Sequence, residues 1–143
     1  MITDFTRAEK IIVKNYGQVG AGTVVDFIER GRVSIIRPRR AKTSDDIVSV
    51  TVSGDSLIDD HIYDGDRLTL RLNFEMSEVK DGRLVVAKLP CGSLTVKHIH
   101  FVDDGSDMKV LLKPANPTYP ELEYDPDEVE IKALVLESVR SWE

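Results

Sequence analysis

The sequence predicts a mostly β fold made of bent β-sheets and hairpins, preceded by an N-terminal arm. Three observations predict it. Short segments alternate β-branched and polar residues, turn signals separate these segments at regular spacing, and no segment shows a long helical period. The chain has 143 residues, of which 41% are hydrophobic and 31% charged, as expected for one globular domain.

The N-terminal part carries the weakest pattern. Residues 11–13, Ile-Ile-Val, predict either a strand or the end of a short helix. Residues 17–22 contain three glycines, which predict a flexible, extended or turning segment. Such a segment serves either as a plain linker or as a stretch that must fit into a narrow cleft. Residues 23–28 and 32–36 are rich in β-branched residues and predict strands around Gly31.

The middle of the chain alternates clearly. Val48, Val50 and Val52 share one face of residues 47–53, which predicts a half-buried strand that ends at Gly54. Asp-Gly and Gly-Ser pairs predict the turns between the strands that follow. Those strands are predicted at 67–72, 83–89, 94–101 and 108–113.

The C-terminal part begins with a loop, 114–120, that three prolines make rigid. Residues 128–139 then alternate, with Val129, Ile131, Ala133, Val135 and Val139 predicted to share one face, and Trp142 follows. This long apolar strand is equally compatible with a core strand and with part of an interface between subunits.

Charge and cysteine content exclude several classes. The net charge of −6 argues against broad phosphate binding, so we predict no direct DNA binding. The short basic cluster 37–40 is predicted to be a solvated loop rather than a contact for an acidic partner or nucleic acid. A single cysteine, Cys91, allows no internal disulfide and fits a reducing cytoplasm. No apolar run approaches the ~20 residues of a membrane helix, so we predict a cytoplasmic protein without membrane contact.

Ser56 follows Gly54 and Asp55 in the turn after the first clear strand. A serine in such a turn most often caps a short helix or bonds its own backbone, and only sometimes is a nucleophile. A nucleophilic serine needs a base within hydrogen-bond distance. The histidines offered are His61, His98 and His100. The last two share a strand face, but no third ligand has suitable spacing, so we predict neither a metal nor a cofactor.

Lys97 is the other candidate base. It lies in the middle of a predicted strand, between apolar neighbours. Such a lysine is usually solvated, but burial disfavours its charged form and lowers its pKa by roughly 3–5 units. A neutral lysine can accept the serine proton, and serine–lysine pairs are a known variant of the catalytic triad.

The letters Gly54-Asp55-Ser56-Leu57 also match the name of the GDSL esterases. That family resembles an α/β fold and pairs its serine with a late Asp-x-x-His block and a Gly-x-Asn-Asp block. Neither block is present in this sequence, and the alternating helices are missing as well. The match is therefore treated as a coincidence.

Several ordered blocks resemble the LexA/UmuD self-cleaving serine peptidases. Residues 53–59, Ser-Gly-Asp-Ser-Leu-Ile-Asp, with Asp-Gly-Asp at 64–66 resemble their nucleophile segment, with Leu57 in place of the usual methionine. Residues 81–97 resemble their catalytic-lysine hairpin, and 112–119 the loop after it. Gly-Gln-Val-Gly-Ala-Gly resembles their cleavage-site segment.

The resemblance implies a LexA/signal-peptidase-like fold and a set of roles. Ser56 would be the nucleophile and Lys97 its base, and the bond between Ala21 and Gly22 would be cut. The residues expected to support the turn and the oxyanion are Gly54, Asp55 and Leu57. Residues 1–22 would form the arm with the cleavage site, and residues 23–143 the peptidase and dimerisation domain.

The resemblance also implies a homodimer that is triggered by a RecA-type recombinase filament during the SOS response to DNA damage. Only 21 residues precede Gly22, too few for the helix-turn-helix domain of the repressors, which favours a UmuD-like accessory protein of a translesion DNA polymerase. One alternative is the C-terminal dimerisation and autocleavage domain of a LexA-like or phage repressor. Another is a dimerisation module that binds partners and no longer cleaves.

Overall fold

The computed structural model describes residues 9–20, 23, 24, 30–39, 41–55, 57–103 and 105–140. Its regular elements are strands and three short 3₁₀ helices. In chain order they are β1 (Lys10–Gly20), β2 (Thr23–Val24), β3 (Arg32–Ile36), β4 (Ile47–Ser53), η2 (Ile58–Asp60), β5 (Arg67–Arg71), η3 (Met76–Glu78), β6 (Leu84–Lys88), β7 (Leu94–Asp103), β8 (Met108–Lys113), β9 (Leu122–Tyr124), η4 (Pro126–Glu128) and β10 (Glu130–Val139). The prediction of a mostly β fold is confirmed.

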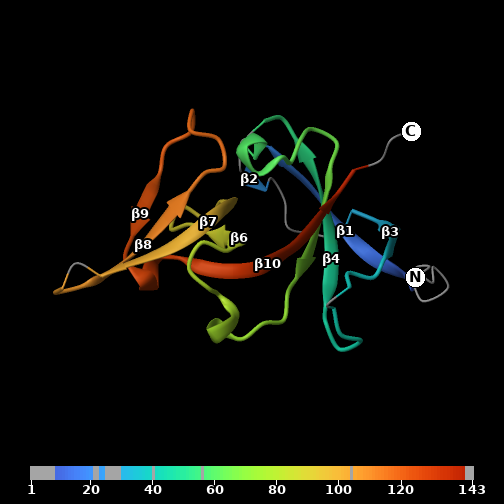
Figure 1. The fold of residues 1–143 in the computed structure, drawn as a ribbon, viewed down its shortest axis with the longest axis horizontal. Coiled ribbons are helices and arrows are strands. Elements are labelled where there is room, and N and C mark those ends of the chain that lie inside the picture. Colours follow the sequence, from blue (N-terminus) through green and yellow to red (C-terminus); the bar gives the residue numbers. More distant parts are fainter. Residues whose placement is uncertain are drawn as a thin grey trace, which may run out of the picture.

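The strands pair into one mixed sheet that closes on itself. Neighbouring strands follow the order β2-β1-β4-β5-β10-β6-β7-β8-β9, and β3 pairs with β1. The short strand β2 also pairs with β7, which joins the two halves of this order into a ring. Figure 1 shows β10 as a long curved strand that crosses the molecule between the β7–β9 side and the β1–β4 side. In the described residues, no helix is long and apolar enough to cross a membrane.

Strand β1 was only weakly indicated by the sequence, yet it is one of the longest strands. It runs parallel to β4 and antiparallel to β3. The register to β4 shifts between Asn15 and Gln18, where Gly17 has a φ of 97° and donates its N–H to Asn15 Oδ1 at 2.8 Å. This bulge interrupts the alternation of side chains, and therefore the sequence shows no period there.

Two large clusters of apolar side chains form most of the core of the described residues, and a third, smaller one contains Val13, Ile35 and Ile47. The first contains Val50, Val52, Leu68, Leu70, Val86 and Val96, and the second contains Val85, Ala87, Ile99, Val110, Leu112 and Leu134. Successive residues of β6 point into different clusters, as the two-residue period of a strand requires. Strand β6 is therefore buried on both faces.

Strand β10 departs from the predicted alternation. Its register shifts between Ile131 and Ala133 against β6, and again between Val135 and Glu137 against β5. Ile131 packs against the second cluster, whereas Ala133 and Val135 belong with the first. The prediction that one face carries all these residues is wrong, because each bulge turns the following residue to the other face.

Candidate active site

Lys97 lies in the middle of β7 and is buried, with 6% of its surface exposed. Its Nζ donates a hydrogen bond to Thr95 Oγ1 at 2.9 Å, two residues earlier on the same strand face. Burial lowers the pKa of Lys97 below the ordinary lysine value, and no carboxylate of the described residues opposes that shift. The Lys97 amine therefore loses its proton more easily than a solvated lysine does.

The backbone at Lys97 lies beside a gap in the sheet. On one edge, β7 pairs with β6 from Leu94 to His98. On the opposite edge, β2 pairs at Leu94 and Thr95 and β8 begins to pair only at His98. Val96 and Lys97 therefore have no strand partner on that edge among the described residues. A segment that is not part of the sheet can approach Lys97 there.

The 54–66 turn, which joins β4 to β5, begins and ends at bonds to the last residues of β4. Val52 donates its N–H to the carbonyl of Asp66 at 2.7 Å and accepts from the N–H of Gly65 at 2.8 Å. Gly54 has a φ of 87° and donates its N–H to Asp64 Oδ1 at 2.9 Å. A residue with a side chain would be strained at this φ, so Gly54 sets the direction of the turn.

Leu57 anchors the turn in the apolar core. Its side chain is fully buried in the first apolar cluster, and its carbonyl accepts the N–H of Ile62 at 3.3 Å. Burying a leucine side chain contributes roughly 1.5–3 kcal/mol relative to exposure. The predicted supporting role of Leu57 in the turn thus has a physical basis in the core.

The loop 114–120 binds the turn from the side. Asn116 Nδ2 donates to the carbonyl of Asp55 at 2.9 Å, and the N–H of Asp59 donates to the carbonyl of Ala115 at 2.7 Å. Tyr119 adds a bond from its hydroxyl to Asp55 Oδ1 at 3.1 Å. Because this loop continues directly from β8, it holds the turn beside the gap at Lys97.

The far end of the turn is held by an ion pair. Arg140 Nε and Nη2 donate to the two oxygens of Asp66 at 2.9 and 3.0 Å, and the guanidinium lies 4.6 Å from the centre of the Tyr63 ring. The Arg140 bonds and the N–H of Tyr63 hold the pKa of Asp66 below its ordinary value, against the effect of burial. The turn is therefore tied to the chain just beyond β10.

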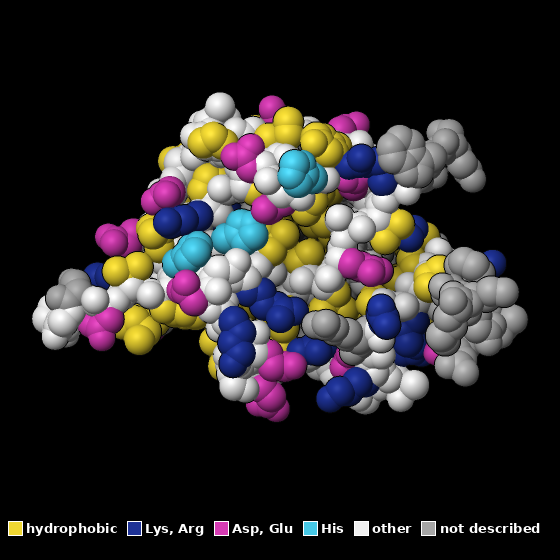
Figure 2. Space-filling view, viewed as in Figure 1, with side chains coloured by type: hydrophobic (Ala, Val, Ile, Leu, Met, Phe, Trp, Pro, Cys, Tyr) yellow, Lys and Arg dark blue, Asp and Glu magenta, His cyan; other side chains and the backbone are white. Residues whose placement is uncertain are grey.

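His98 follows Lys97 and joins three elements. Its Nε2 lies 2.7 Å from Asp60 Oδ2 in η2, and its Nδ1 lies 2.7 Å from the carbonyl of Gly82. The Asp60 bond is the main reason that the pKa of His98 is raised. His100 pairs instead with Asp81 at 3.2 Å. In Figure 2, histidine side chains lie beside acidic ones on this face. The described residues contain no cluster of three metal-ligating side chains.

The described residues on either side of the predicted cleavage site pair with β4, which precedes Ser56, and with β7, which carries Lys97. Gly20 pairs with Thr23 and with Ser53 at the end of β4. Thr23 pairs in turn with Thr95 of β7. Since β1 and β4 are parallel, they end on the same side. Since β2 and β7 are antiparallel, the start of β2 lies toward Lys97.

Three of the predicted site residues, Ser56, Ala21 and Gly22, lie outside the described residues, so their roles stay predictions. Among the described ones, Gly54 donates its N–H to Asp64, the carbonyl of Asp55 accepts from Asn116, and the side chain of Leu57 is buried; their supporting role at the site stays a prediction. Sequence reasoning missed the residues that hold these groups in place, namely Thr95, Asn116, Tyr119, Asp60, His98 and Arg140. The signals in the sequence were the block 112–119, through its resemblance to the loop after the lysine hairpin, the block 81–97, which contains Thr95, and His98 as a candidate base.

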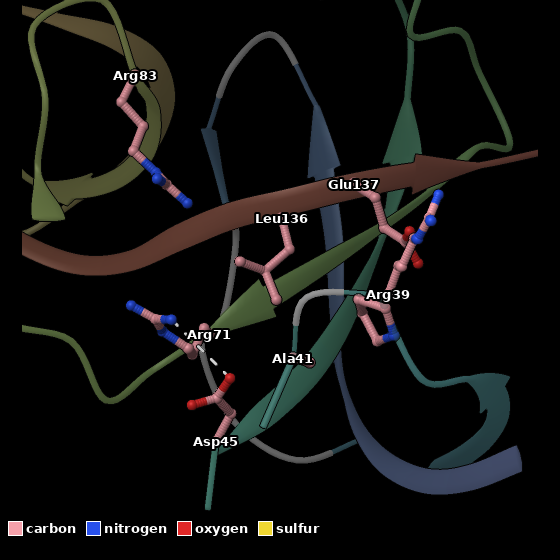
Figure 3. Close-up of a pocket in the computed structure, with 8 residues that line it drawn as sticks. Arg39, Ala41, Asp45, Arg71, Arg83, Leu136 and Glu137 are labelled. Atoms are coloured by element: carbon pink, nitrogen blue, oxygen red, sulfur yellow. Dashed lines mark ion pairs between the residues drawn. The ribbon is translucent and has the colours of Figure 1, made fainter. Parts of the chain in front are cut away.

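A separate cavity of about 480 Å³ lies between the loop before β4 and the strands β5, β6 and β10. Figure 3 shows Arg83 directed toward it, Arg71 paired with Asp45, and Leu136 and Glu137 contributed by β10. Figure 2 shows lysine and arginine side chains gathered over the lower part of this face. None of the residues that line this cavity belongs to the site around Lys97.

Comparison with known proteins gives a consistent result. The Peptidase S24-like family model matches residues 12–136. The LexA repressor of Erythrobacter litoralis is 31% identical over 127 residues, which cover 89% of this chain and 51% of the repressor. The LexA repressor of Exiguobacterium sp. is 35% identical over 109 residues, or 76% of this chain and 50% of the repressor. The LexA repressor of Syntrophotalea carbinolica is 33% identical over 127 residues, which cover 88% of this chain and 58% of the repressor. The chain thus spans about half the length of these relatives.

Proposed function

Because this chain belongs to the Peptidase S24-like family, we propose that it is a self-cleaving serine peptidase that cuts its own bond between Ala21 and Gly22. Ser56 is the nucleophile and Lys97 the base. The observation that carries the proposal is the state of Lys97, a buried amine with a lowered pKa and no carboxylate partner among the described residues. A structural lysine of a sheet is normally solvated or paired, and a buried unpaired amine is suited to accept a proton.

The strand pairings support the choice of substrate. Gly20 lies beside Ser53, three residues before Ser56, and Thr23 lies beside Thr95, two residues before Lys97. Three residues of extended chain span at most about 10 Å. The flanks of the Ala21–Gly22 bond are therefore within a short reach of both proposed catalytic groups. Because enzyme and substrate are one chain, the reaction gains effective concentration.

The proposed reaction is acyl transfer followed by hydrolysis. Ser56 Oγ attacks the carbonyl carbon of Ala21 while its proton passes to Lys97 Nζ. The carbon–nitrogen bond breaks, Lys97 returns the proton to the amine of Gly22, and an ester between Ala21 and Ser56 remains. Water attacks this ester with Lys97 again as base, which releases Ser56 and leaves a carboxylate on Ala21.

The oxyanion of the tetrahedral intermediate needs backbone N–H donors next to Ser56. Gly54 supports the turn rather than the oxyanion, because its N–H already donates to Asp64. We therefore assign the oxyanion to the N–H groups that follow, with Leu57 as the donor that the core holds in place.

Two biological settings fit this activity. The UmuD-like role, in which residues 1–21 of the arm are removed from a homodimer that serves a translesion polymerase, remains a prediction from the sequence. The LexA repressors that match over most of this chain favour the second setting, the dimerisation and autocleavage domain of a LexA-like repressor. In both, a RecA-type filament on damaged DNA promotes cleavage in the cytoplasm by shifting a two-state equilibrium.

The test is incubation of the purified chain at several pH values, followed by intact mass measurement. We expect two products that separate at Ala21–Gly22, at a rate that rises with pH as Lys97 loses its proton. Ser56→Ala and Lys97→Ala should each slow cleavage by at least about 100-fold, with Lys88→Ala on β6 as a matched surface control. A wild-type chain that stays whole even with an activated filament would instead support a partner-binding module.

A further inference from the structure

His98 has a hydrogen-bond acceptor at each ring nitrogen. The Gly82 carbonyl can only accept, so Nδ1 must carry a proton to bond it at 2.7 Å. The contact between Nε2 and Asp60 at 2.7 Å needs a second proton between the two atoms. An imidazole binds protons more tightly than a carboxylate does, so that proton resides on Nε2. The observed geometry is that of a doubly protonated His98.

The two bonds span the elements that carry the proposed dyad. Asp60 lies in η2, four residues after Ser56, and His98 follows Lys97 directly. Gly82 belongs to the turn that enters β6, whose strand pairs with β7 along Lys97. His98 and Asp60 are each about a quarter exposed, so water screens their pairing only in part. Neighbouring residues of a strand point to opposite faces. His98 therefore binds the turn on the face of β7 opposite to the amine of Lys97.

We propose that doubly protonated His98 is a positioning residue that holds the 54–66 turn against β7 by bridging Asp60 and the Gly82 carbonyl. This inference rests on the proposed self-cleavage. It means that cleavage requires two neighbouring residues in opposite states, a neutral Lys97 and a charged His98.

The surroundings of His98 favour the charged form. Asp60 faces it from η2, and the Gly82 carbonyl faces it from the turn before β6. On β8 its strand partner is Lys113, and on its own strand the nearest titratable groups are Lys97 on the other face and His100, which is paired with Asp81. The Asp60 bond raises the pKa of His98, the Gly82 bond adds to this, and burial opposes it. The bridge is therefore complete at low pH and is lost as the pH rises through that raised value.

The pH profile of cleavage distinguishes this role from a merely structural one. While Lys97 is mostly protonated, each pH unit provides tenfold more neutral amine. Above the pKa of His98, each further pH unit also lowers the fraction of chains that hold the bridge by a factor of ten. The two effects on the cleavage rate then cancel. For the wild-type chain, we expect the logarithm of the rate to rise with a slope of one and then to become flat.

Two substitutions of His98 test the bridge. His98→Arg keeps a permanent charge and several donors, so its rate should keep rising with a slope of one where the wild type is flat. His98→Gln carries no charge, so it should cleave at least about 100-fold more slowly below that pH and show a slope of one throughout. His100→Arg and His100→Gln are matched controls on the same strand face and should stay within twofold of the wild type at every pH.

A titration of the His98 ring by NMR, in the Ser56→Ala chain that stays whole, provides a readout without cleavage. We expect a midpoint above the ordinary histidine value, which Asp60→Asn moves back toward that value. Wild-type and His98→Arg chains with the same slope at all pH values, or a midpoint that Asp60→Asn does not move, overturn the positioning role alone. No cleavage of the wild type at any pH overturns the proposed function and this role with it.

Discussion

In the 54–66 turn, side chains supply many of the bonds to the rest of the molecule, whereas β7 is held by backbone pairing along its length. Asp66, Asp60 and Leu57 bond or pack from within the turn, and Asn116 and Arg140 reach it from elsewhere. The backbone of Lys97 is held by the pairing of β7 with β6.

The difference arises because the backbone hydrogen-bonding groups of a turn and of a central strand find their partners in different ways. A turn leaves backbone groups without a ladder, so side chains must bind them. A central strand has its ladder and instead supplies a dry surrounding, which is what lowers the pKa of Lys97. A single substitution should therefore loosen the turn, whereas on β7 it should change the chemistry and leave the strand in place.

The largest effect is expected from Lys97→Met. Cleavage should be lost, because methionine cannot accept a proton, while the free energy of unfolding at pH 7 should rise by about 1 kcal/mol. The gain arises because the folded chain binds the lysine proton less tightly than the unfolded chain does. It should shrink as the pH rises toward the ordinary lysine pKa, where both states lose the proton.

Urea unfolding at neutral and alkaline pH measures this gain. Lys88→Met, at the exposed end of neighbouring β6, is the matched control and should change neither cleavage nor stability appreciably. A Lys97→Met chain less stable than the wild type would mean that burying the Lys97 amine does not destabilise the folded chain. The contrast drawn between the turn and β7 would then be wrong.

A smaller effect is expected from Asp66→Asn, which removes the charge that Arg140 binds. The free energy of unfolding at pH 7 should fall by about 2 kcal/mol, since charge-assisted bonds to a buried group are lost. The folded state lowers the pKa of Asp66, so its contribution is present above the ordinary carboxyl value and is lost as the pH falls through the lowered one. The two chains should therefore become equally stable in acid.

Asp64→Asn is the control within the same turn, because Asp64 accepts the N–H of Gly54 but binds no arginine in the described residues. Its loss of stability should be less than half as large, and urea unfolding at pH 7 compares the two. Equal losses would show that the Arg140 ion pair has no special part in holding the turn.

The smallest effect is expected from Tyr119→Phe. The lost bond to Asp55 lies at the surface, where water replaces it easily, and Asn116 still holds the same residue. The cleavage rate, measured by intact mass, should fall less than about threefold and the unfolding midpoint should not move. A tenfold slower variant would mean that the Asn116 bond cannot hold the turn alone.

Local patterns predicted the strands well and the connections between them less well. The strand of Val48, Val50 and Val52 and the turn at Gly82 follow from alternation and turn chemistry, and the structure confirms both, although Ser49 on the predicted outer face of the strand is fully buried. The parallel pairing of β1 with β4 could not be predicted, because a bulge at Gly17 hides the period and the pairing joins distant segments. The bulges of β10 were missed because its apolar residues alternate in the sequence straight through them.

The site shows the same division. Burial of Lys97 was one of two interpretations of its apolar neighbours, and the resemblance to the self-cleaving peptidases favoured it over a solvated lysine. The bond of Asn116 to Asp55 joins residues 61 positions apart, and that of His98 to Asp60 joins residues 38 apart. Each of these side chains is ordinary for a loop or a strand surface, so only the folded chain reveals its partner.

Strand β1 lies on the N-terminal side of the proposed cut, yet it pairs with β3 and β4, which lie on the other side. Breaking the Ala21–Gly22 bond would therefore turn a covalent strand into a bound peptide, and its departure would be a separate dissociation step governed by affinity and dilution. When that peptide leaves, the edge of β4 loses its partner, and an unpaired edge is a template for adding a strand from another chain. Cleavage and the change of surface that follows it would then be two events with separate rates.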